Sequence, residues 1–468
     1  MKFNYDLIII GGGSAGLTAA RLASSLGAKV CIVEKSDLGG DCLQYGCVPS
    51  KSLIAMNKIL HSPYLETLGL KFEPYKIDFR KLADDIKNTI NIVATSDSAE
   101  NLLKQGIDVH YGKANFVDKN TINVEGKKFT AKKFLIATGS HPYIPKINGL
   151  EKVDYLTNEN IFSLNDLPRT MIIVGGGPIG CELAQAFSLL GTEVTIIQRN
   201  ERLLPKDDLD ASNFLLKKFI KQKISVLLKE EISEVNKTET GVEIKLKSGK
   251  NLKAEKILIC IGRESNISGL GLEKIGVNYG KSGIVINKYL QSSVKNIYAA
   301  GDVTRTYQFT HFAGYQAAIA IRNAVFPSFL KTKFSFESMP WVTFTSPEIA
   351  HVGKTEQDLK NENFVFEKHT LQYSDIDRAI TDKVTDGFIQ YYTDSLGYIV
   401  GATITGERAG ELIMNFVYAI DHQLKSIDLV KSIFPYPTYS SGIQKLIWDD
   451  YLKKLKTNKF VKFLRLFA

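Results

Sequence analysis

The sequence is poor in cysteine and has no long apolar run, and both absences narrow the function. Five cysteines among 468 residues is an odd, low number that does not fit a disulfide-stapled secreted scaffold, so a close cysteine pair indicates catalysis or metal binding rather than structure. No run approaches the ~20 apolar residues of a membrane-spanning helix. The apolar stretch Tyr5–Ile10 is too short for a signal peptide and leads into glycines rather than a cleavage site. We therefore expect a cytoplasmic protein.

The positive net charge does not form a nucleic-acid-binding patch. Although the net charge is +9, lysines lie in runs no longer than two with acidic residues between them, which is typical of a solvated basic surface. The stretch 452–467 is the exception, because basic residues alternate there with leucine and phenylalanine. This pattern fits a helix on a membrane surface, and it fits an ordinary helix packed on the protein at least as well. Its apolar face and flanking charges are Phe460, Phe463, Leu464, Phe467, Lys459, Lys462 and Arg465.

Length and composition predict several domains of parallel α/β type. A chain of 468 residues with 44% hydrophobic content can form about two to four domains at roughly 100–200 residues each. Apolar strands alternate with helical segments from the first residues, which favours parallel sheets covered by helices. We predict one dinucleotide-binding domain from residues 1–148 and 266–336, a second from 149–265, and an α+β domain from 337–468.

Two segments repeat the same order of strand, glycine-rich turn, helix and strand. Each carries GxGxxG between strand and helix, which is the context in which this motif binds a dinucleotide. The glycines allow a tight turn and a close approach to a pyrophosphate, and the helix N-terminus offers N–H groups to its charge. A tight turn without a ligand is the weaker interpretation, so we predict two dinucleotides, a flavin and a nicotinamide. The first unit comprises Tyr5–Ile10, Gly11–Gly16, Leu17–Leu26 and Lys29–Glu34, and the second comprises Thr170–Val174, Gly175–Gly180, Cys181–Leu190 and Glu193–Ile197.

The residue that ends the second strand differs between the two units. Glu34 lies 23 residues after Gly11, and Gln198 lies 23 residues after Gly175. A glutamate suits the hydroxyls of a ribose without a 2′-phosphate, as in FAD. Gln198 is followed by Arg199, a cation that attracts a 2′-phosphate, so we favour NADPH and keep NADH as the alternative. The other interpretation of Arg199 is a solvated surface residue.

The segment GGDCLQYGCVPSK, residues 39–51, is the most specific in the chain. Cys42 and Cys47 are separated by four residues at the start of a helical stretch and can close a small disulfide beside a flavin. A helix N-terminus lowers the pKa of a thiol and stabilises the thiolate needed for exchange. A structural disulfide is unexpected in a cytosolic protein, and a zinc site would need further ligands. We therefore predict a redox-active pair and no resident metal.

The three remaining cysteines have simpler interpretations. Cys31 and Cys260 lie in apolar strands and are expected to be packed. Cys181 borders Glu182 at a helix start, which leaves a redox role open, but a buried filler is the simpler interpretation.

With these motifs in place, the chain resembles the pyridine nucleotide-disulfide oxidoreductases, which include dihydrolipoamide dehydrogenase, glutathione reductase and mercuric reductase. The resemblance covers nearly the whole length. It implies a glutathione reductase-like α/β fold, with two Rossmann-like dinucleotide-binding domains and a C-terminal α+β dimerisation domain of a homodimer. Besides the glycine-rich turns and the cysteine pair, the motifs that carry it are Ala137-Thr138-Gly139, Ile261-Gly262-Arg263, Ala300-Gly301-Asp302 and Pro340–Gly353.

The resemblance also implies roles for individual residues. Cys47 would be the flavin-proximal, charge-transfer thiol and Cys42 the interchange thiol that meets the acceptor. Lys51 would lie near the flavin N5 and pair with Glu182, because a carboxylate partner limits the desolvation cost of a buried lysine. Asp302 would hold the ribityl or phosphate part of FAD. The implied FAD-binding set is Gly11, Gly13, Gly16, Glu34, Lys35, Gly40, Lys51, Ala114, Thr138, Gly139, Gly301 and Asp302, and the implied nicotinamide-binding set is Gly175, Gly177, Gly180, Gln198, Arg199 and Gly262.

The C-terminal segment departs from the disulfide-reducing relatives. These carry a histidine, oriented by a glutamate five residues later, that exchanges protons with the substrate dithiol. Here Tyr436 and Ser441 occupy the two positions, and no histidine follows His422. A tyrosine with a pKa of ~10 is a poor base at neutral pH. Residues 434–436, Phe-Pro-Tyr, are similar to mercuric reductase, although the cysteine pair that ends those enzymes is not found at residues 465–468.

Together these features predict a flavin enzyme that passes electrons from NADPH through FAD and a disulfide to an acceptor, in the manner of mercuric reductase. The acceptor would be a metal ion, a quinone or a disulfide. A divergent dihydrolipoamide dehydrogenase is the second hypothesis, and a flavin-containing binding or membrane-docking module is the third. The predicted catalytic residues are Cys42, Cys47, Lys51, Glu182 and Tyr436.

Overall fold

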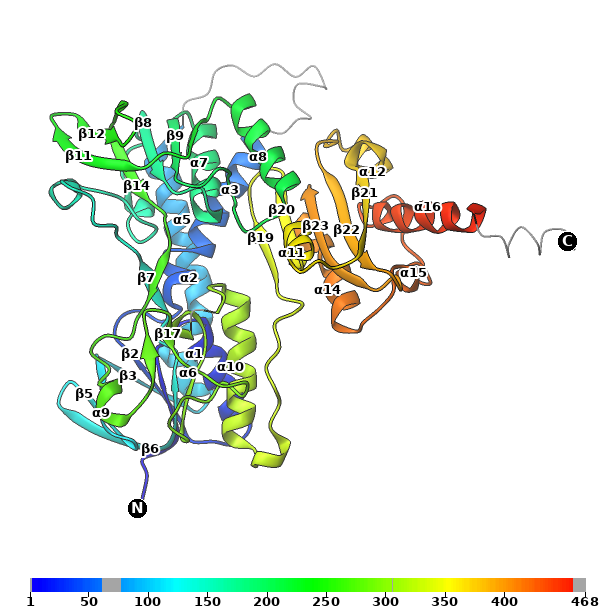
Figure 1. The fold of residues 1–468 in the computed structure, drawn as a ribbon. Coiled ribbons are helices and arrows are strands. Elements are labelled where there is room, and N and C mark those ends of the chain that lie inside the picture. The colour runs from blue at the N-terminus through cyan, green and yellow to red at the C-terminus, as the bar shows by residue number, and fades with distance from the viewer. Residues whose placement is uncertain (1, 61–76, 305, 458–468) are drawn as a thin grey trace, which may run out of the picture.

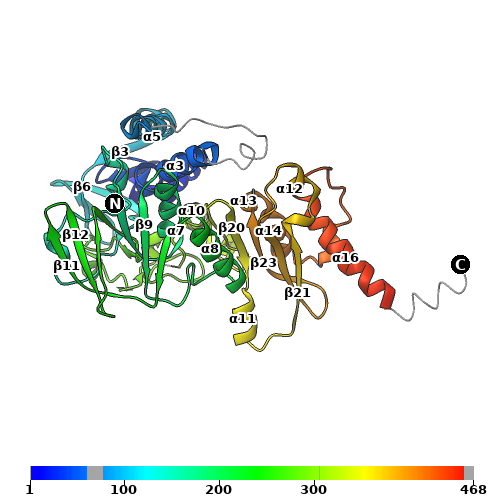
Figure 2. The same ribbon diagram turned by 90° about the horizontal axis from the view of Figure 1, so that it is seen from above.

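The chain folds into two α/β units and a C-terminal unit that stands beside them. In this computed structural model the described residues are 2–60, 77–304 and 306–457. Figure 1 shows the first unit below the second, with the C-terminal unit to their right. Seen from above, the C-terminal unit projects to one side of both (Figure 2).

The first unit is built on a mostly parallel sheet with β1 (Tyr5–Ile10) near its centre. The strand order is β3-β2-β1-β6-β5-β4, and β18 joins beside β6 although the whole second unit separates these two strands in sequence. The runs YDLIII of β1 and VCIVE of β2 are buried at nearly every position, as expected for parallel strands covered on both faces. Helices α1 (Ser14–Ser25) and α10 (Thr310–Val325) pack against each other on this unit.

The other elements of the first unit come from two separate parts of the chain, before and after the second unit. Their bounds are Val30–Glu34 for β2, Gly40–Gln44 for α2, Cys47–Leu60 for α3, Phe79–Ala94 for α5, Ala99–Lys104 for α6, Ile107–Tyr111 for β3, Ala114–Asp118 for β4, Thr121–Val124 for β5, Lys127–Ile136 for β6, Leu272–Ile275 for α9, Tyr279–Gly280 for β16, Gly283–Ile284 for β17 and Ile297–Ala299 for β18.

The second unit repeats this plan on a smaller scale. Its parallel strands have the order β10-β9-β8-β14, and an antiparallel sheet of β11, β12 and β13 packs beside them. Strands β7 and β15 pair with each other and link the two units. The bounds are Ser140–Pro142 for β7, Thr170–Val174 for β8, Pro178–Leu189 for α7, Glu193–Gln198 for β9, Leu209–Lys221 for α8, Ser225–Leu228 for β10, Ile232–Thr238 for β11, Gly241–Leu246 for β12, Asn251–Ala254 for β13, Lys256–Ile259 for β14 and Arg263–Ser265 for β15.

The helices after both glycine-rich turns begin three residues earlier than predicted. Gly13 and Gly177 have extended backbones and cap α1 and α7, so each helix starts directly after the second glycine of its motif. Pro178 occupies the first position of α7, where a missing N–H costs nothing. The N-terminal N–H groups of each helix therefore lie within the motif itself.

The C-terminal unit is an antiparallel sheet with helices, as predicted for an α+β domain. Its strand order is β19-β20-β23-β22-β21, and α16 lies against β21. The bounds are Pro340–Thr343 for β19, Glu348–Gly353 for β20, Glu356–Asn361 for α11, Phe366–Gln372 for β21, Asp377–Thr381 for α12, Phe388–Asp394 for β22, Ile399–Gly406 for β23, Ala409–Leu412 for α13, Met414–Asp421 for α14, Ser426–Leu429 for α15 and Ser441–Thr457 for α16.

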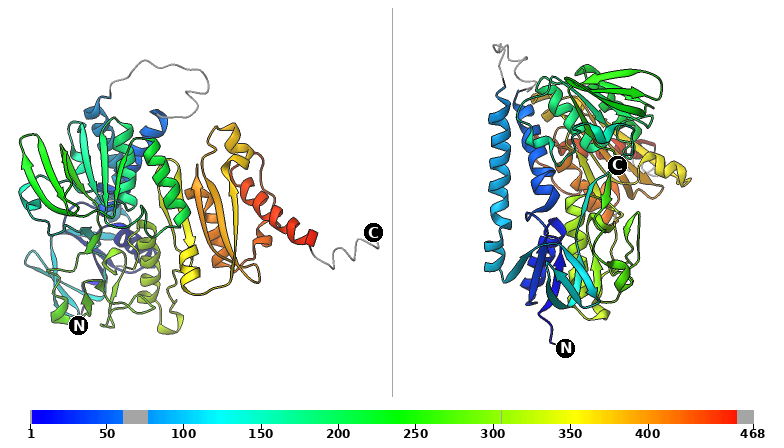
Figure 3. Two further views of the ribbon diagram at one scale, coloured as in Figure 1. Left: turned by 45° about the horizontal axis from the view of Figure 1, so that its top comes forward. Right: turned by 90° about the vertical axis from the view of Figure 1, so that its left-hand side faces the viewer.

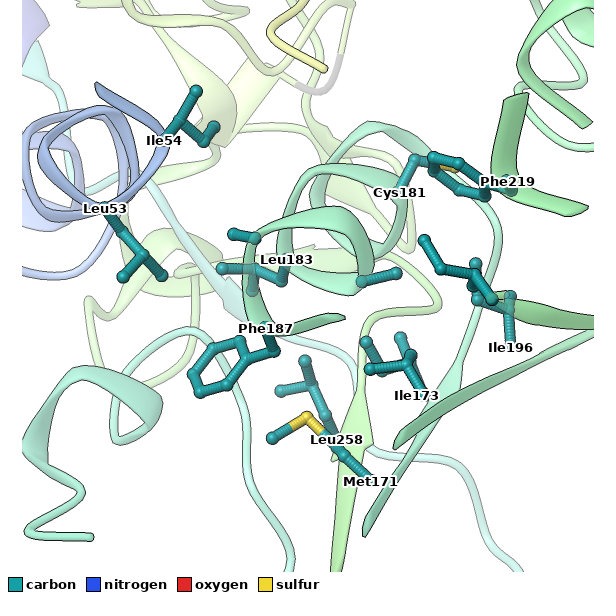
Figure 4. Close-up of a cluster of buried hydrophobic side chains, with 14 of the residues drawn as sticks. Leu53, Ile54, Met171, Ile173, Cys181, Leu183, Phe187, Ile196, Phe219 and Leu258 are labelled. Carbon is teal, nitrogen blue, oxygen red and sulfur yellow. The ribbon is translucent and has the colours of Figure 1, made fainter. Parts of the chain in front are cut away.

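A hydrophobic cluster joins α3, which carries the second cysteine, to the second unit. Figure 3 shows α3 and α5 running side by side along the edge of the molecule. Leu53 of α3 is buried and points toward α7 (Figure 4), and Ile54 of α3 is buried in the same cluster. Leu183 and Phe187 of α7 are almost fully buried in the same cluster. Burying one such side chain stabilises the fold by ~1.5–3 kcal/mol, so the position of α3 relative to α7 is well fixed.

The three cysteines outside the predicted pair lie in or next to the cores. Cys31 and Cys181 are fully buried, as expected for packed thiols, and Cys260 is partly buried one residue beyond β14. Among the described residues, no helix is both long and apolar enough to cross a membrane. The apolar face predicted at residues 459–467 lies outside the described residues.

Candidate active site

The first glycine-rich turn is so tight that only glycine fits at two of its positions. Gly11 has a φ of +109°, and a Cβ there would lie 2.3 Å from the carbonyl oxygen of Ala137. A Cβ on Gly16 would lie 1.9 Å from the carbonyl oxygen of Gly11. Glycine adopts a positive φ at little cost. The turn therefore presents backbone, rather than side chains, in front of α1.

The second turn reproduces this geometry. Gly175 has a φ of +113°, and its Cβ would lie 2.4 Å from the carbonyl oxygen of Cys260. A Cβ on Gly180 would lie 2.0 Å from the carbonyl oxygen of Gly175. At Gly177, a Cβ would meet no atom within 4 Å, so this glycine is not required by packing and fits the close approach of a ligand.

Glu34 closes the first turn from the end of β2. Its buried carboxylate accepts hydrogen bonds from the backbone N–H groups of Gly12 at 2.5 Å and Ser36 at 2.9 Å. Lys35, the next residue, is exposed. The carboxylate is thus fixed beside the N-terminus of α1, where the ribose of a dinucleotide is expected.

Gln198, at the end of β9, is the uncharged counterpart of Glu34 in the second unit. It is buried, and its side-chain amide donates to the carbonyl oxygen of Arg202 at 3.3 Å. The Arg202 guanidinium is turned to its own loop and donates to the carbonyl oxygen of Pro205 at 2.9 Å. Arg199 is exposed and lies within electrostatic range of Glu231. Of the two arginines that follow β9, Arg199 is therefore the one oriented toward solvent.

Cys42 of α2 and Cys47 of α3 have their sulphur atoms in hydrogen-bonding contact. Cys47 is the first residue of α3, where the helix dipole favours a thiolate. Its sulphur also lies 3.4 Å from the hydroxyl of Thr310. The bond from Cys42, then that from Thr310 and the charge of Lys51, lower the pKa of Cys47 to about 6. The same bond and burial raise the pKa of Cys42, so at neutral pH Cys47 is the thiolate and Cys42 the thiol.

Lys51 lies one turn after Cys47 on α3 and forms the predicted pair with Glu182. The Nζ to Oε2 distance is 2.9 Å, and the Glu182 side chain is buried. The other oxygen of Glu182 accepts from the backbone N–H of Phe344 at 2.8 Å. The Lys51 ammonium also lies 4.5 Å from the centre of the Phe344 ring. The pair is therefore held from three sides, by α3, α7 and the segment after β19.

A polar network joins Asp302 to the residue before Cys42. The Arg263 guanidinium forms an ion pair with Asp41 at 3.0 Å and donates to the hydroxyl of Ser140 at 2.7 Å. That hydroxyl donates to the Asp302 carboxylate at 2.6 Å. Burial raises the pKa of Asp302. The network fixes the Asp302 side chain near the cysteine segment.

The other predicted cofactor-binding residues lie at the ends of strands and helices. The Thr138 hydroxyl donates to the carbonyl oxygen of Asn266 at 2.7 Å, and the Gly301 N–H donates to the buried Gln316 side chain at 2.7 Å. Ala114 begins β4 and is buried. Gly40 and Gly139 have φ values of +61° and +68°, and Gly262 of the predicted nicotinamide-binding set has a φ of +137°.

Tyr436 lies on the loop between α15 and α16, in the C-terminal unit. Its side chain is 74% exposed, and its hydroxyl donates to the Asp377 carboxylate at 3.0 Å. Ser441 is the first residue of α16 and donates to the carbonyl oxygen of Thr438. Within one chain Tyr436 bonds to Asp377 rather than to either cysteine, and its place at the partner's Cys42 stays a prediction.

The donor set fits two dinucleotides. Each turn presents backbone N–H groups at a helix N-terminus, which suits a pyrophosphate, and the residues in front of α1 and α7 are glycines where a side chain would obstruct it. The chain matches the family model of the pyridine nucleotide-disulphide oxidoreductases over residues 5–317 and that of their dimerisation domain over residues 339–447. The chain belongs to this family. This oxidoreductase is therefore a member of a group of FAD-dependent enzymes that use a pyridine nucleotide.

Several relatives are similar over most of this oxidoreductase. A mercuric reductase of Lysinibacillus sphaericus is 35% identical, covering 97% of this chain and 84% of that relative. A dihydrolipoyl dehydrogenase of Staphylococcus aureus is 31% identical, covering 92% of this chain and 94% of that relative. A solved Cu(II) complex of the HOCl-induced flavoprotein disulfide reductase RclA from Escherichia coli has a TM-score of 0.86 at 25% identity, covering 96% of this chain and 99% of that one. LpdA from Mycobacterium tuberculosis has a TM-score of 0.87 at 26% identity, covering 95% of this chain and 99% of that one.

Sequence reasoning missed two side chains of this site. Thr310 contacts the Cys47 sulphur from the first turn of α10. Arg263 lies within a predicted motif, but its bonds to Asp41 and Ser140 were not foreseen. A threonine at the start of an apolar helix, eight residues after Asp302, was the available signal for Thr310. Nothing in the sequence showed which way Arg263 would turn.

Proposed function

We propose that this oxidoreductase passes electrons from NADPH through FAD and the Cys42–Cys47 pair to an acceptor other than lipoamide or glutathione disulfide, in the manner of mercuric reductase. The observation that carries this proposal is the contrast between the residues around the cysteine pair and the residue at the acceptor position. The Cys47 thiolate and the Lys51–Glu182 pair are present, whereas Tyr436 stands where disulfide-reducing relatives have a histidine.

The residues of this chain would divide the work as follows. FAD, when bound, supplies two-electron exchange between the nicotinamide and the cysteines. Gly11, Gly13, Gly16 and Glu34 would hold it, and Lys51 would place a positive charge where negative charge develops. Cys42 and Thr310 hold the Cys47 thiolate, while the Cys42 thiol keeps its proton until an acceptor approaches.

The donor side favours NADPH. Gln198 puts a neutral amide where a carboxylate would repel a 2′-phosphate, and the exposed Arg199 follows it. The Glu231 carboxylate nearby is bonded to Lys247, which reduces its competition for Arg199. These observations support NADPH over NADH.

The comparisons support a metal ion among the acceptors. The similar mercuric reductases are named for a metal ion, and the solved structure of RclA contains Cu(II). We therefore place Hg(II) and Cu(II) first in a series of acceptors, followed by a quinone and lipoamide.

Steady-state rates with this series test the proposal. With NADPH as donor, we expect at least one of Hg(II), Cu(II) and the quinone to be reduced faster than lipoamide. Tyr436→Phe should slow transfer to that acceptor and leave reduction of the flavin by NADPH unchanged. Absence of turnover with every acceptor would contradict the proposal.

A divergent dihydrolipoamide dehydrogenase is the second candidate, because a dihydrolipoyl dehydrogenase is 31% identical to this chain. A positioned base typically contributes ~10²–10⁴-fold to rate. Without one, dihydrolipoamide oxidation should be slow and should rise with pH as the substrate thiol ionises unaided. Fast, pH-independent turnover near neutrality, untouched by Tyr436→Phe, would favour this second candidate.

The dimerisation domain supports a homodimer. In that assembly the C-terminal unit of one protomer would bring Tyr436 to the partner's Cys42. Analytical ultracentrifugation of the active protein tests this, since a fully active monomer is incompatible with a site shared by two chains.

A further inference from the structure

Two tyrosine–aspartate hydrogen bonds hold the loop of Tyr436 beside α12. The Tyr436 hydroxyl donates to Asp377 at 3.0 Å, and the Tyr439 hydroxyl donates to Asp382 at 2.8 Å. Tyr439 is buried, and Asp382 also accepts from Arg378 at 2.7 Å. The second bond is therefore an internal anchor of the loop. Tyr436 is exposed, so packing does not fix the orientation of its side chain, and the bond to Asp377 does.

The chemistry of the pair fixes the direction of the phenol proton. An ionised carboxylate only accepts hydrogen bonds, so Tyr436 must be the donor, and its oxygen then offers only lone pairs to other groups. The bond to the Asp377 carboxylate raises the pKa of Tyr436, which keeps the phenol neutral. Arg378 forms a hydrogen bond with Asp382, and Lys445 donates to the carbonyl oxygen of Asp375.

We propose that Asp377 is the positioning residue of Tyr436, and that this pair, drawn from two different elements, replaces the histidine–glutamate pair of the disulfide-reducing relatives. The inference rests on the proposed function, which places Tyr436 at the acceptor end. Ser441, at the position of the glutamate, is turned to its own loop, so the orienting carboxylate comes from α12 instead. Tyr436 acts there as a neutral hydrogen-bond acceptor or oxygen ligand, because its own proton is directed to Asp377.

Titration of the phenol tests the pair directly. Ultraviolet absorption near 295 nm follows tyrosinate formation, and the difference between each protein and its Tyr436→Phe counterpart isolates this one tyrosine. We expect Asp377→Asn to lower the titration midpoint of Tyr436, since the amide accepts the bond without the charge. Asp382→Asn is the matched control: it weakens the other tyrosine–aspartate bond of the same loop and should leave the Tyr436 midpoint unchanged.

Turnover links the pair to the acceptor. The donor is NADPH, and the probes are Hg(II) with excess cysteine, Cu(II), and a quinone. With the fastest probe, Asp377→Ala should lower kcat by about tenfold, as expected for the loss of one hydrogen bond, and Asp377→Asn should lower it less. Flavin reduction by NADPH should stay unchanged in both variants.

An unchanged Tyr436 midpoint in Asp377→Asn would overturn the inference, as would an equal loss of turnover in Asp382→Asn, which would indicate a loop-folding effect. A shifted midpoint with unaltered turnover in both Asp377 variants would also overturn it. Failure of the proposed function is distinct, because it would appear in the unaltered protein as a lack of turnover with every probe.

Discussion

The hydrogen bond from Cys42 to Cys47 can be tested by comparing two substitutions that differ in one donor group. A thiolate beside an oxidised flavin gives a long-wavelength absorption band. In the unaltered protein the band appears after two-electron reduction of the disulfide, whereas the Cys42 variants have no disulfide and are titrated with the flavin oxidised. Cys42→Ser keeps a hydroxyl donor, whereas Cys42→Ala removes the donor. The pKa of Cys47 is lowered from 9.0 to about 6, and the bond from Cys42 is the largest cause. Because the folded-state pKa is depressed, the thiolate is present above it and is lost as the pH falls through about 6.

The size of the effect follows from this shift. One pKa unit corresponds to ~1.4 kcal/mol, so three units correspond to ~4 kcal/mol. Cys47 is exposed in the single chain, and solvent screens its contacts, so we reduce this stabilisation of the thiolate to about 2 kcal/mol. A single hydrogen bond of ~1–1.5 kcal/mol then moves the midpoint by about one unit. An anaerobic pH titration of the band should give a midpoint about one unit higher in Cys42→Ala, and within a few tenths of the unaltered value in Cys42→Ser. Equal midpoints in the two variants would refute the role of the bond.

Four further substitutions test other parts of the protein. Lys51→Met should raise the pH midpoint of the same band and Glu182→Gln should lower it, because the two charges act on the Cys47 thiolate in opposite directions. Shifts of the same sign would contradict this electrostatic account. Arg199→Glu should reverse a preference for NADPH over NADH, measured as kcat/KM for each nucleotide. The change should be at most the ~1.5–3 kcal/mol of a charged hydrogen bond, and equal use of both nucleotides by the unaltered enzyme would remove the basis of this prediction. Phe187→Ala should destabilise the fold by ~3–5 kcal/mol in denaturant unfolding, because the ring is almost fully buried in the hydrophobic cluster that α3 and α7 share. A loss below ~1 kcal/mol would show that the cluster does not fix these helices.

Local patterns predicted the parts of this protein that depend on backbone. The glycine-rich turns need glycine because a Cβ at Gly16 or Gly180 would collide with a carbonyl oxygen. The glycine motif in the sequence therefore predicts the geometry of the turn directly. Strand β1 and strand β8 have the bounds predicted from their apolar runs. The α+β character of the C-terminal unit was also predictable, since strand-like runs after residue 337 are followed by helical segments.

Contacts between distant side chains were harder to predict. The pairing of Lys51 with Glu182 came from resemblance, because nothing in the spacing of residues 131 apart brings α3 to α7. Thr310 and Asp377 lie far from the cysteines and from Tyr436 in sequence, and only the packing of α10 and α12 brings them into contact. The helix starts were misplaced by three residues because Gly13 and Gly177 cap the helices instead of ending a loop.

Counting thiols before and after reduction tests the central claim, that electrons from the nicotinamide reach the Cys42–Cys47 pair. The chain has five cysteines, and three of them, Cys31, Cys181 and Cys260, lie outside the pair. Protein purified in air and alkylated under denaturing conditions should show three reactive thiols, and protein reduced anaerobically with NADPH should show five, the two new ones at Cys42 and Cys47. Five thiols before reduction, or no increase after it, would contradict the account.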